Sequence, residues 1–589
     1  MARFCVCLAS GTGPADGRPG AADLHLAAMG APAIAPGLGL VRGEPGHAEG
    51  PFDAHGMRAV GEVTLHNRAE LRAALTADGA PAPPEAADGE LLLRCWARLG
   101  ARGVALAEGM FALAVLDGDD LVLIRDHVGA RTLFYARAAD AWAAATSLRA
   151  LRRWPALGTR MNLSAVRSFL TFAYLPGDET LLEGVREVLP GRVLRLAADG
   201  TVTETVHWEP RERLDGPARG SDDHVLTLRA LLEEATARRL PDAEPVGVLL
   251  SGGIDSSLVT ALAAKLHSHP VHTYSISFGD ELPNELGYSG LVAAHCHTRH
   301  RVLTVSGTAV AARLADTAAL LDSPVGDPLT VPNLMLAEAV AGDGLRTVLN
   351  GEGGDPVFGG PKNLPMLVQE MHAGTPGAHG SPWYQDRATA YLRSYRKCWT
   401  DLPDLLTAGA LSALESAPPP QRFVEPYLTG PDRMTHLLNQ LLHCNLRTKG
   451  AHHILTKVER LTASQGIQGR APLFDRHVVD HAFATPPALK LRGTAEKWVL
   501  KEAVRDLLPA TVVDRPKSGM RVPVQQWLNG PLRELGGDLL LGRDARRRGL
   551  FRPDTVRTWL RGEGTLLPRQ GGKLWLVLTL ELWLRAYDL

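Results

Sequence analysis

Residues 246–257 read VGVLLSGGIDSS, and this stretch decides the fold of the second half of the chain. Residues 246–250 are apolar, as in a strand buried within a parallel sheet, and residues 258–268 (LVTALAAKLHS) have a helical pattern. Two glycines in between let the backbone approach an anion closely, while serine hydroxyls and the amides at a helix N-terminus supply donors. Asp255 would repel phosphates unless it holds a Mg²⁺ ion that neutralises them. The stretch therefore predicts a strand–loop–helix site for a phosphate chain.

The elements around this loop alternate between helix and strand. Helices are expected at 225–239 and 331–341, and strands at 271–278 and 346–350. This alternation predicts an α/β domain with a parallel, doubly wound sheet that binds ligands at the carboxyl ends of its strands. The chain beyond about residue 385 is mostly helical, and 574–587 (LWLVLTLELWLRAY) predicts a buried C-terminal helix.

The N-terminal third has a different pattern of expected secondary structure. Short strand-like runs divided by Gly, Asp and Pro predict a sheet-rich α+β domain, interrupted by helices at 68–75 and 90–99. Residues 210–223 (PRERLDGPARGSDD) are polar and rich in Gly and Pro, which is typical of a linker. We therefore predict a first domain at 1–208, a linker at 209–223 and a second domain at 224–589.

Composition limits the possible classes of protein. The 589 residues are 45% hydrophobic and 22% charged with a net charge of −1, which excludes wholesale disorder and argues against nucleic-acid or membrane binding. The six cysteines form no disulfide framework, so we expect a cytoplasmic location. No stretch is long and apolar enough for a signal peptide or a membrane span. Lysine is scarce and absent before Lys265, so a lysine in a polar loop is a candidate functional residue.

A second glycine-rich loop, NGEGGDPVFGG at 350–360, follows the strand expected at 346–350. In a parallel sheet it would lie beside the first loop, so Glu352 and Asp355 would face a bound nucleotide or substrate. The first loop resembles the SGGxDSS pyrophosphate loop of the ATP pyrophosphatases, and the second is similar to the SGEG(A/S)DE loop of glutamine-dependent asparagine synthetases. The segments at 323–338, 457–475, 496–509 and 515–532 also resemble that family.

The resemblance implies a role for each matching residue. Glu352 takes the place of the acid–base glutamate, Asp355 that of the loop aspartate, and Lys517 that of the catalytic lysine. ATP and Mg²⁺ are the implied cofactors, with the metal on Asp255 and Asp355. The implied ATP and pyrophosphate contacts are Ser251, Gly252, Gly253, Asp255, Ser256, Ser257, Gly351 and Lys497, and those on the adenine side are Leu249, Leu250 and Ser277. For Lys497 a structural role is favoured over phosphate contact, and Arg470 and Asp475 could position the substrate or form a buried ion pair.

The chain departs from the family pattern at the second loop. The family's first serine is Asn350, and its Asp-Glu pair is Asp355-Pro356. These changes put substrate recognition in doubt but leave the adenylation residues in place. β-lactam synthetases, by resemblance, would carry tyrosine where this chain has Glu352.

The first domain resembles the family's glutaminase domain, an N-terminal-nucleophile fold, at 61–72, 88–96, 108–117, 125–135, 145–151 and 174–191. Glutaminase chemistry needs a cysteine whose free amine acts as the base. Residue 2 is Ala, and the nearest cysteines are Cys5 and Cys7. Gly61 follows Val60 where the family has an oxyanion-hole asparagine, and Asp88 alone remains at the substrate-amine position. We therefore expect a degenerate, inactive glutaminase.

Two histidine-containing segments are weaker signals. Cys296-His-Thr-Arg-His300 has zinc-ligand residue types but no second pair at ligand spacing, so we interpret it as a helix-to-strand surface segment. His452-His453 reads as a helix face, and Trp575 and Trp583, two helical turns apart, read as core residues.

The sequence thus predicts an ATP-dependent ligase that adenylates a small-molecule or peptide carboxylate and transfers the acyl group to an amine. By resemblance, β-lactam synthetases and lasso-peptide cyclases share the lost cysteine, which favours natural-product biosynthesis. The alternatives are an asparagine synthetase and, from another class, a catalytically dead nucleotide-binding regulator. Homodimers are common in the family, and no nucleic-acid or membrane partner is expected.

Overall fold

The computed structural model describes residues 3–9, 21–41, 47–138, 140–158, 160–214, 219–279, 285–359, 367, 387–395, 397–429, 434–516, 519–563 and 572–589. The chain forms two compact units. Unit 1 comprises Met1–Asn162, Gly177–Glu209 and Ile454–Gly466, and unit 2 comprises Leu163–Pro176, Pro210–His453 and Ile467–Leu589. The positions of Lys517 and Ser518 lie outside the described residues.

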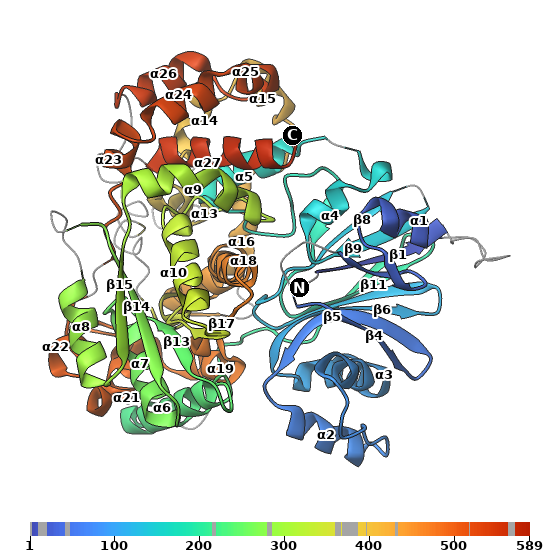
Figure 1. The fold of residues 1–589 in the computed structure, drawn as a ribbon, viewed down its shortest axis with the longest axis vertical. Coiled ribbons are helices and arrows are strands. Elements are labelled where there is room, and N and C mark those ends of the chain that lie inside the picture. The colour runs from blue at the N-terminus through green and yellow to red at the C-terminus, as the bar shows by residue number, and fades with distance from the viewer. Residues whose placement is uncertain are drawn as a thin grey trace, which may run out of the picture. The chain divides into compact units, whose positions relative to one another are not determined.

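Unit 1 is built on two antiparallel sheets (Figure 1). The first has the order β10-β8-β9-β1-β3-β2 and the second the order β12-β11-β7-β6-β5-β4. The strands of the first sheet are β1 (Arg3–Ala9), β2 (Ala33–Ala35), β3 (Leu38–Val41), β8 (Phe134–Ala138), β9 (Ala141–Ala145) and β10 (Val185–Glu187). Those of the second are β4 (Glu49–Ala54), β5 (Met57–Leu65), β6 (Gly109–Asp117), β7 (Asp120–Arg125), β11 (Arg192–Ala197) and β12 (Val202–Val206).

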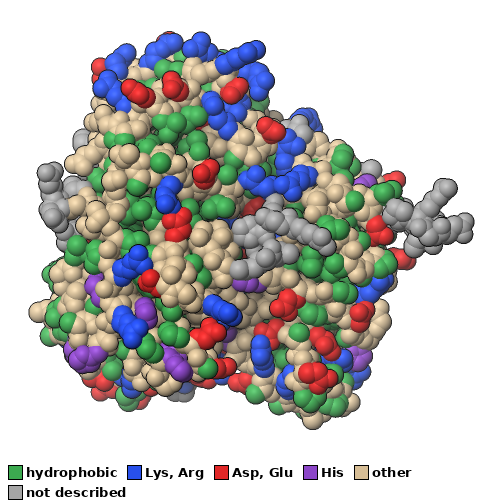
Figure 2. Space-filling model, viewed as in Figure 1, with side chains coloured by type: hydrophobic (Ala, Val, Ile, Leu, Met, Phe, Trp, Pro, Cys, Tyr) green, Lys and Arg blue, Asp and Glu red, His purple; other side chains and the backbone are tan. Residues whose placement is uncertain are grey.

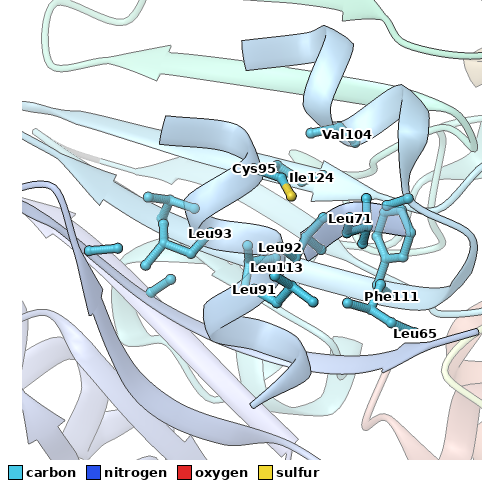
Figure 3. Packing of buried hydrophobic residues seen from close by; sticks show 14 of the residues in the cluster. Leu65, Leu71, Leu91, Leu92, Leu93, Cys95, Val104, Phe111, Leu113 and Ile124 are labelled. Carbon is cyan, nitrogen blue, oxygen red and sulfur yellow. The ribbon is translucent and has the colours of Figure 1, made fainter. Parts of the chain in front are cut away.

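Two apolar cores hold unit 1 together. One core joins the two sheets and includes Phe4 and Val6 from β1 with Ala112 and Ala114 from β6. The other lies between the second sheet and the helices α2 (Arg68–Ala77) and α3 (Asp88–Leu106), where Leu91 and Leu92 of α3 pack near Phe111 and Leu113 of β6 (Figure 3). Helices α1 (Ala21–Ala28) and α4 (Leu148–Arg152) lie against the first sheet.

Unit 2 contains a five-stranded sheet with the order β15-β14-β13-β16-β17, and all of its pairs are parallel. Its strands are β13 (Val246–Leu249), β14 (Val271–Ser277), β15 (Arg299–Thr304), β16 (Thr347–Leu349) and β17 (Gln468–Arg470). The chain leaves β13 toward β14 on one side and later returns to β16 on the other. The boundary between β13 and β16 is therefore the topological switch point, where doubly wound sheets bind ligands.

Helices such as α7, α8 and α10 flank this sheet, and further helices form the rest of unit 2 (Figure 1). Those before β17 are α5 (Leu163–Phe172), α6 (Ser221–Ala237), α7 (Ile254–Leu266), α8 (Leu286–His295), α9 (Gly307–Leu320), α10 (Thr330–Gly342), α11 (Gly354–Phe358), α13 (Arg387–Tyr395), α14 (Leu402–Leu405), α15 (Ala408–Ala413), α16 (Glu425–Leu428), α17 (Leu437–Asn445) and a π-helix (Leu446–Leu455). Helix α18 (Thr456–Ser464) belongs to unit 1. Those that follow are α19 (Arg476–Ala484), α20 (Pro487–Lys490), α21 (Trp498–Ala503), α22 (Ala510–Val513), α23 (Val524–Asn529), α24 (Arg533–Leu541), α25 (Arg543–Arg548), α26 (Pro553–Leu560) and α27 (Gly572–Ala586), together with the hairpin β18 (Leu491–Arg492) and β19 (Ala495–Glu496).

The C-terminal helices combine a buried core with a basic surface. Trp575 and Trp583 on α27 are buried, which confirms the predicted C-terminal helix and the core role of both tryptophans. Lysine and arginine side chains gather over α24, α25 and α26 (Figure 2). No helix among the residues described is long and apolar enough to cross a bilayer.

Most predicted elements occur close to their expected bounds, with one difference at the linker. Helix α6 begins at Ser221, inside the stretch interpreted as linker. Asp222 and Asp223 lie in its first turn, and the Asp223 carboxylate accepts a hydrogen bond from the Gly220 amide at 3.2 Å. Carboxylates stabilise a helix N-terminus, so the last residues of the polar stretch start the helix instead of extending the linker.

Candidate functional site

The two glycine-rich loops meet at the switch point of the parallel sheet. Strands β13 and β16 are paired through Gly247 with Val348 and through Val248 with Leu349, so their carboxyl ends lie side by side. Residues 250–253 then lead into α7, and residues 350–353 lead into α11. The sheet thus places both predicted loops at the one position where its topology favours a ligand.

The first loop is ordered by its own serines. The Ser256 hydroxyl accepts a hydrogen bond from the Ser251 amide at 3.1 Å, donates to the Gly253 carbonyl at 3.2 Å and lies 3.0 Å from the Ser251 hydroxyl. Gly252 has a φ of +82°, which favours glycine, and a Cβ there would lie 2.7 Å from the Ser289 amide nitrogen. The loop is therefore a turn that precedes the N-terminus of α7, the arrangement that binds phosphates.

The second loop packs backbone to backbone against the first. A Cβ on Gly351 would lie 2.4 Å from the Ser256 amide nitrogen, and one on Gly354 would lie 2.2 Å from Oδ1 of Asp255. A side chain at Gly351 would displace the backbone of the first turn of α7, and one at Gly354 would displace the Asp255 carboxylate. Gly351, predicted as a nucleotide contact, therefore also lets the two loops pack together.

Lys497 joins the acidic residues of the two loops. Its Nζ lies 2.5 Å from Oδ2 of Asp255 and 2.6 Å from Oδ1 of Asp355, and its side chain is 1% exposed. Lys497 precedes α21 with a φ of +54°, a conformation that is strained for a residue with a side chain. Burial lowers the pKa of the ammonium, but the two carboxylates raise it by more, so the net shift is upward. Lys497 is therefore a charged centre of this site.

Glu352 lies in the second loop, between the end of β16 and the start of α11. Its amide donates to Oδ1 of Asn350 at 3.1 Å, so the asparagine that replaces the family's serine orders the loop. Asn350 is 2% exposed, and its buried Nδ2 has no hydrogen-bond partner within the ranges that the structure describes. Glu352 itself is partly exposed and can meet a ligand.

The residues predicted on the adenine side lie at the ends of neighbouring strands. Leu249 ends β13, and the Leu250 amide donates to the Tyr274 carbonyl of β14 at 2.8 Å. Ser277 ends β14, and its hydroxyl accepts a hydrogen bond from the Gly279 amide at 3.2 Å. Ser257 is buried on α7, and its hydroxyl has no hydrogen-bond partner in the described part of the chain.

The loop that carries Lys517 approaches the first loop through Arg515. The Arg515 guanidinium donates to the Gly252 carbonyl at 3.2 Å, pairs with Glu285 and lies 3.9 Å from the ring centroid of Tyr288. Arg515 was not predicted as a site residue, although it lies two residues before Lys517 in RPKSG. Lys517 itself lies outside the described residues.

The acidic residues fit the metal that the sequence predicts. Among the described residues the buried Oδ1 of Asp255 has no hydrogen-bond partner, while its Oδ2 contacts Lys497. Mg²⁺ is usually held by one or two carboxylates together with substrate phosphates. The described residues contain no group of three or more His, Cys, Asp or Glu side chains that could hold a metal by themselves. A metal on Asp255 and Asp355 would thus depend on the nucleotide.

The predicted glutaminase residues are engaged within unit 1. Cys5 and Cys7 lie on β1 and are at most 1% exposed, and burial raises the pKa of Cys7 to about 12. Gly61 lies on β5, where a Cβ would be 2.7 Å from Leu113. The Asp88 carboxylate accepts from the Leu65 amide at 2.9 Å and pairs with Arg68 at 2.5 Å.

The remaining candidates have structural contacts. Asp475 caps α19 and pairs with Arg239 at 2.9 Å, and Arg470 donates to the Arg239 carbonyl at 2.8 Å. Cys296 follows α8, and β15 begins at Arg299, which confirms the helix-to-strand interpretation. His452 and His453 lie in the π-helix instead of on an α-helical face.

These features define a phosphate-type site at the switch point of a parallel sheet, preceded in sequence by a two-sheet antiparallel unit. Models of two known protein families match this chain. The asparagine synthase family model matches residues 227–585, and the model of the glutamine amidotransferase domain matches residues 51–208. The first match covers more than half of the chain, which therefore belongs to the asparagine synthase family. The enzyme class is that of the ATP-dependent ligases that form C–N bonds, and the fold is an N-terminal-nucleophile-like domain followed by a parallel-sheet domain with a helical C-terminal part.

Individual relatives show modest identity over most of the chain. Asparagine synthetase [glutamine-hydrolyzing] 1 of Bacillus subtilis is 23% identical over 88% of this chain and 84% of its own length. Carboxyethyl-arginine beta-lactam-synthase of Streptomyces clavuligerus is 29% identical over 77% of this chain and 72% of its own length. Amidase chyE of Penicillium rubens is 23% identical over 76% of this chain and 74% of its own length.

Proposed function

We propose that this protein adenylates a substrate carboxylate with ATP and transfers the acyl group to an amine, in the biosynthesis of a natural product. The observation that carries the proposal is the arrangement of Asp255, Asp355 and Lys497 at the switch point, next to a loop built for phosphates. The similarity to a β-lactam synthase supports a product other than asparagine. Such a ligase closes a β-lactam ring or the amide of a lasso peptide.

The first step forms an acyl-adenylate. A carboxylate oxygen attacks the α-phosphorus, the bond to the β,γ-phosphates breaks, and pyrophosphate leaves. The serine hydroxyls and backbone amides at 251–257 bind the departing phosphates. Asp255 and Asp355 would hold Mg²⁺, which neutralises phosphate charge when it is bound.

The second step forms the amide. The amine nitrogen attacks the acyl carbon, Glu352 accepts the proton that the nitrogen loses, and AMP leaves with the electrons of the broken C–O bond. A positioned base contributes about 10²–10⁴-fold to such a step. Lys517 would stabilise the negative charge that develops on the tetrahedral intermediate.

The amine is free ammonia or a group on the substrate, because Cys5 and Cys7, the cysteines nearest the start of the sequence, are buried on β1. A thiol with a pKa near 12, as at Cys7, carries almost no thiolate at neutral pH. Asp88 is held by Arg68 and by the backbone, which leaves the residue a structural role.

An asparagine synthetase is the second candidate, because the Bacillus subtilis enzyme matches over 88% of the chain. Glu352 at the acid–base position also agrees with it. A catalytically dead nucleotide binder is the least consistent candidate, since Asp255, Glu352 and Lys517 are all retained.

ATP–pyrophosphate exchange with a panel of carboxylic acids tests the proposal. The panel contains L-aspartate, L-glutamate, N-carboxyethyl amino acids and short peptides with a free Asp or Glu side chain. Exchange with an acid other than aspartate supports the natural-product ligase, and exchange with aspartate alone supports the asparagine synthetase. Binding of ATP without exchange for any acid would overturn both.

A further inference from the structure

Arg515 lies against the first loop and against the start of α8. Its guanidinium donates to the Gly252 carbonyl at 3.2 Å, pairs with the Glu285 carboxylate and lies 3.9 Å from the ring centroid of Tyr288. The side chain is 12% exposed. A guanidinium that meets a carbonyl, a carboxylate and an aromatic face at once is held in one position, because its donors and its plane are all engaged.

The backbone of Arg515 is held by a second helix. The Lys501 ammonium on α21 donates to the Arg515 carbonyl at 3.2 Å. Lys497, which joins the two loops, lies one turn earlier, and its carbonyl accepts a hydrogen bond from the Lys501 amide at 3.0 Å. Helix α21 therefore fixes both the lysine between the loops and the arginine on the first loop.

The contact with Gly252 fixes the orientation of one peptide unit. In a planar trans peptide the carbonyl and the N–H point in opposite directions. The Gly252 carbonyl points to Arg515, and the Gly253 amide donates to the Ser251 hydroxyl at 3.4 Å. The peptide thus presents its N–H toward the serine hydroxyls of the loop. A phosphate is attracted by such an N–H, whereas a carbonyl oxygen in its place would repel it.

Glycine on both sides allows this peptide to turn over. A flip changes ψ of Gly252 and φ of Gly253, and glycine adopts positive φ about as readily as negative φ. Gly253 has a φ of −77°, and a Cβ there would lie 3.6 Å from Oγ of Ser251, an ordinary contact. Backbone preference alone therefore does not select the orientation, and the hydrogen bond from Arg515 supplies the selection.

We propose that Arg515 is a positioning residue for the β- and γ-phosphates of ATP, because it keeps the N–H of the Gly252–Gly253 peptide turned toward them. The inference deepens the proposed function and rests on it. Arg515 acts through the loop, since its guanidinium is engaged by the Gly252 carbonyl and by Glu285. Its loss should weaken ligands that carry the β,γ-phosphates and spare AMP, which lacks them.

Two other roles for Arg515 would give different results. If it only stabilises packing, its removal lowers the thermal stability and leaves the affinities of the folded protein unchanged. If it binds a phosphate directly, Glu285 competes with that phosphate, so Glu285→Ala strengthens pyrophosphate binding. In the proposed role Glu285 helps to hold the guanidinium, so the same substitution weakens pyrophosphate binding.

Isothermal titration calorimetry with Mg²⁺–pyrophosphate, Mg²⁺–ATP and AMP tests the inference on the wild type, Arg515→Met, Arg515→Lys, Glu285→Ala and Arg548→Met. Arg548, on α25, is the matched control, because its side chain is 10% exposed, pairs with Glu581 at 2.5 Å and donates to the main-chain oxygen of Leu589 at 2.6 Å. We expect Arg515→Met to weaken pyrophosphate and ATP about 10- to 100-fold, the effect of losing one hydrogen bond to a charged group, and to leave AMP unchanged. Arg515→Lys should recover part of the loss, and Arg548→Met should behave as the wild type.

An unchanged affinity for pyrophosphate in folded Arg515→Met, an equal loss for AMP, or tighter pyrophosphate binding in Glu285→Ala would overturn the inference. Thermal unfolding shows whether each variant is folded; if Arg515→Met is not, Arg515→Gln is measured in its place. The proposed function fails in a different way, since the wild type would then bind ATP but show no exchange with any acid.

Discussion

The ammonium of Lys497 lies 2.5 Å from Oδ2 of Asp255, a contact between residues that are far apart in the sequence. Asp255 lies in the first turn of α7, and Lys497 precedes α21. Asp355, from the second loop, lies 2.6 Å from the same ammonium. One buried lysine therefore ties together the three segments that the proposed chemistry requires.

Replacing Asp255 should disable adenylation. Asp255→Asn removes the carboxylate that pairs with Lys497 and that would bind the metal. We therefore expect the rate of ATP–pyrophosphate exchange to fall by at least about 10²-fold, as when an enzyme loses one group that stabilises charge in the transition state. Asp242→Asn, the same change at an exposed position before β13, is the control. Exchange at the wild-type rate in Asp255→Asn would contradict the assignment.

Glu352 should act in the second step alone. Glu352→Gln removes the proton acceptor for the amine, so amide formation should fall by about 10²–10⁴-fold. Exchange, which reports adenylation only, should stay within about tenfold of the wild type because the loss concerns the later proton transfer. Glu338→Gln on α10, whose carboxylate pairs with Arg313, is the matched control. An equal loss in both assays would show that Glu352 is needed for adenylation instead.

Unit 1 should release no glutamate from glutamine. Cys5 and Cys7 are buried on β1, and burial raises the pKa of Cys7, so neither thiol is placed to act as a nucleophile. The variants Cys5→Ala and Cys7→Ala should therefore keep full exchange activity. Glutamate release by the wild type that disappears in either variant would refute the inactive assignment.

Lys490 should make stability depend on pH. Burial lowers the pKa of Lys490 to about 7, while the nearby Glu212 raises it, and its Nζ donates to Oδ1 of Asn439 at 2.7 Å. Because the pKa in the unfolded chain is about 10.4, between these values the unfolded state binds a proton that the folded state does not. Stability therefore rises with pH across this window, by up to about 1.4 kcal/mol per pH unit.

Denaturant unfolding between pH 7.5 and 9.5 measures this slope. The variant Lys490→Met should reduce it, and Lys265→Met, at an exposed lysine, should leave it unchanged. If the free energy of unfolding still rises with pH in Lys490→Met, the pH dependence comes from groups other than Lys490.

A buried ion cluster should stabilise unit 1. Arg3 lies 3.2 Å from Oε1 of Glu62 and 3.4 Å from Oε1 of Glu459, and all three side chains are 2% exposed. Arg3→Met leaves these carboxylates without that cation, so we expect a loss of about 3–5 kcal/mol in the free energy of unfolding. Arg98→Met, at a more exposed pair with Asp78, should cost less than about 1 kcal/mol.

The same cluster should make the free energy of unfolding fall at acidic pH. Burial raises the pKa of Glu62, but Arg3, Arg131 and Arg460 lower it by more, so the net pKa is lowered. Its stabilisation is present above the unfolded pKa of about 4.3 and is lost as the pH falls through the folded value. A loss of stability in Arg3→Met no larger than in Arg98→Met would contradict the role of the cluster.

The sequence was informative where local chemistry repeats a known pattern. The strand–loop–helix at 246–266 could be predicted because glycines, serines and an apolar run each favour the same local structure. The approach of Gly351 to Ser256 also follows, since parallel neighbouring strands end at one edge of a sheet. These features require only local pattern and strand order.

The pairing of Lys497 with both aspartates could not be predicted in the same way. The pairing depends on where α21 packs in the folded chain. The hydrophobic periodicity of the sequence predicts that a helix forms but not where it packs. The π-helix was also missed, because a π-helix differs from an α-helix in its i→i+5 backbone hydrogen bonds, which the residues at 446–455 do not reveal. The contact of Arg515 with the first loop is likewise a tertiary contact, which its place in RPKSG does not by itself predict.

The chain crosses between its two units at 162–163, 176–177, 209–210, 453–454 and 466–467. Helix α18, encoded among the ligase motifs, lies in unit 1, where Arg460 donates to the Thr132 hydroxyl and the Thr146 carbonyl. A truncated chain without residues 1–209 would still contain α18, but the Thr132 and Thr146 groups that accept hydrogen bonds from Arg460 would be absent. The core of the first unit is therefore required for folding of the chain whether or not that unit keeps a reaction of its own.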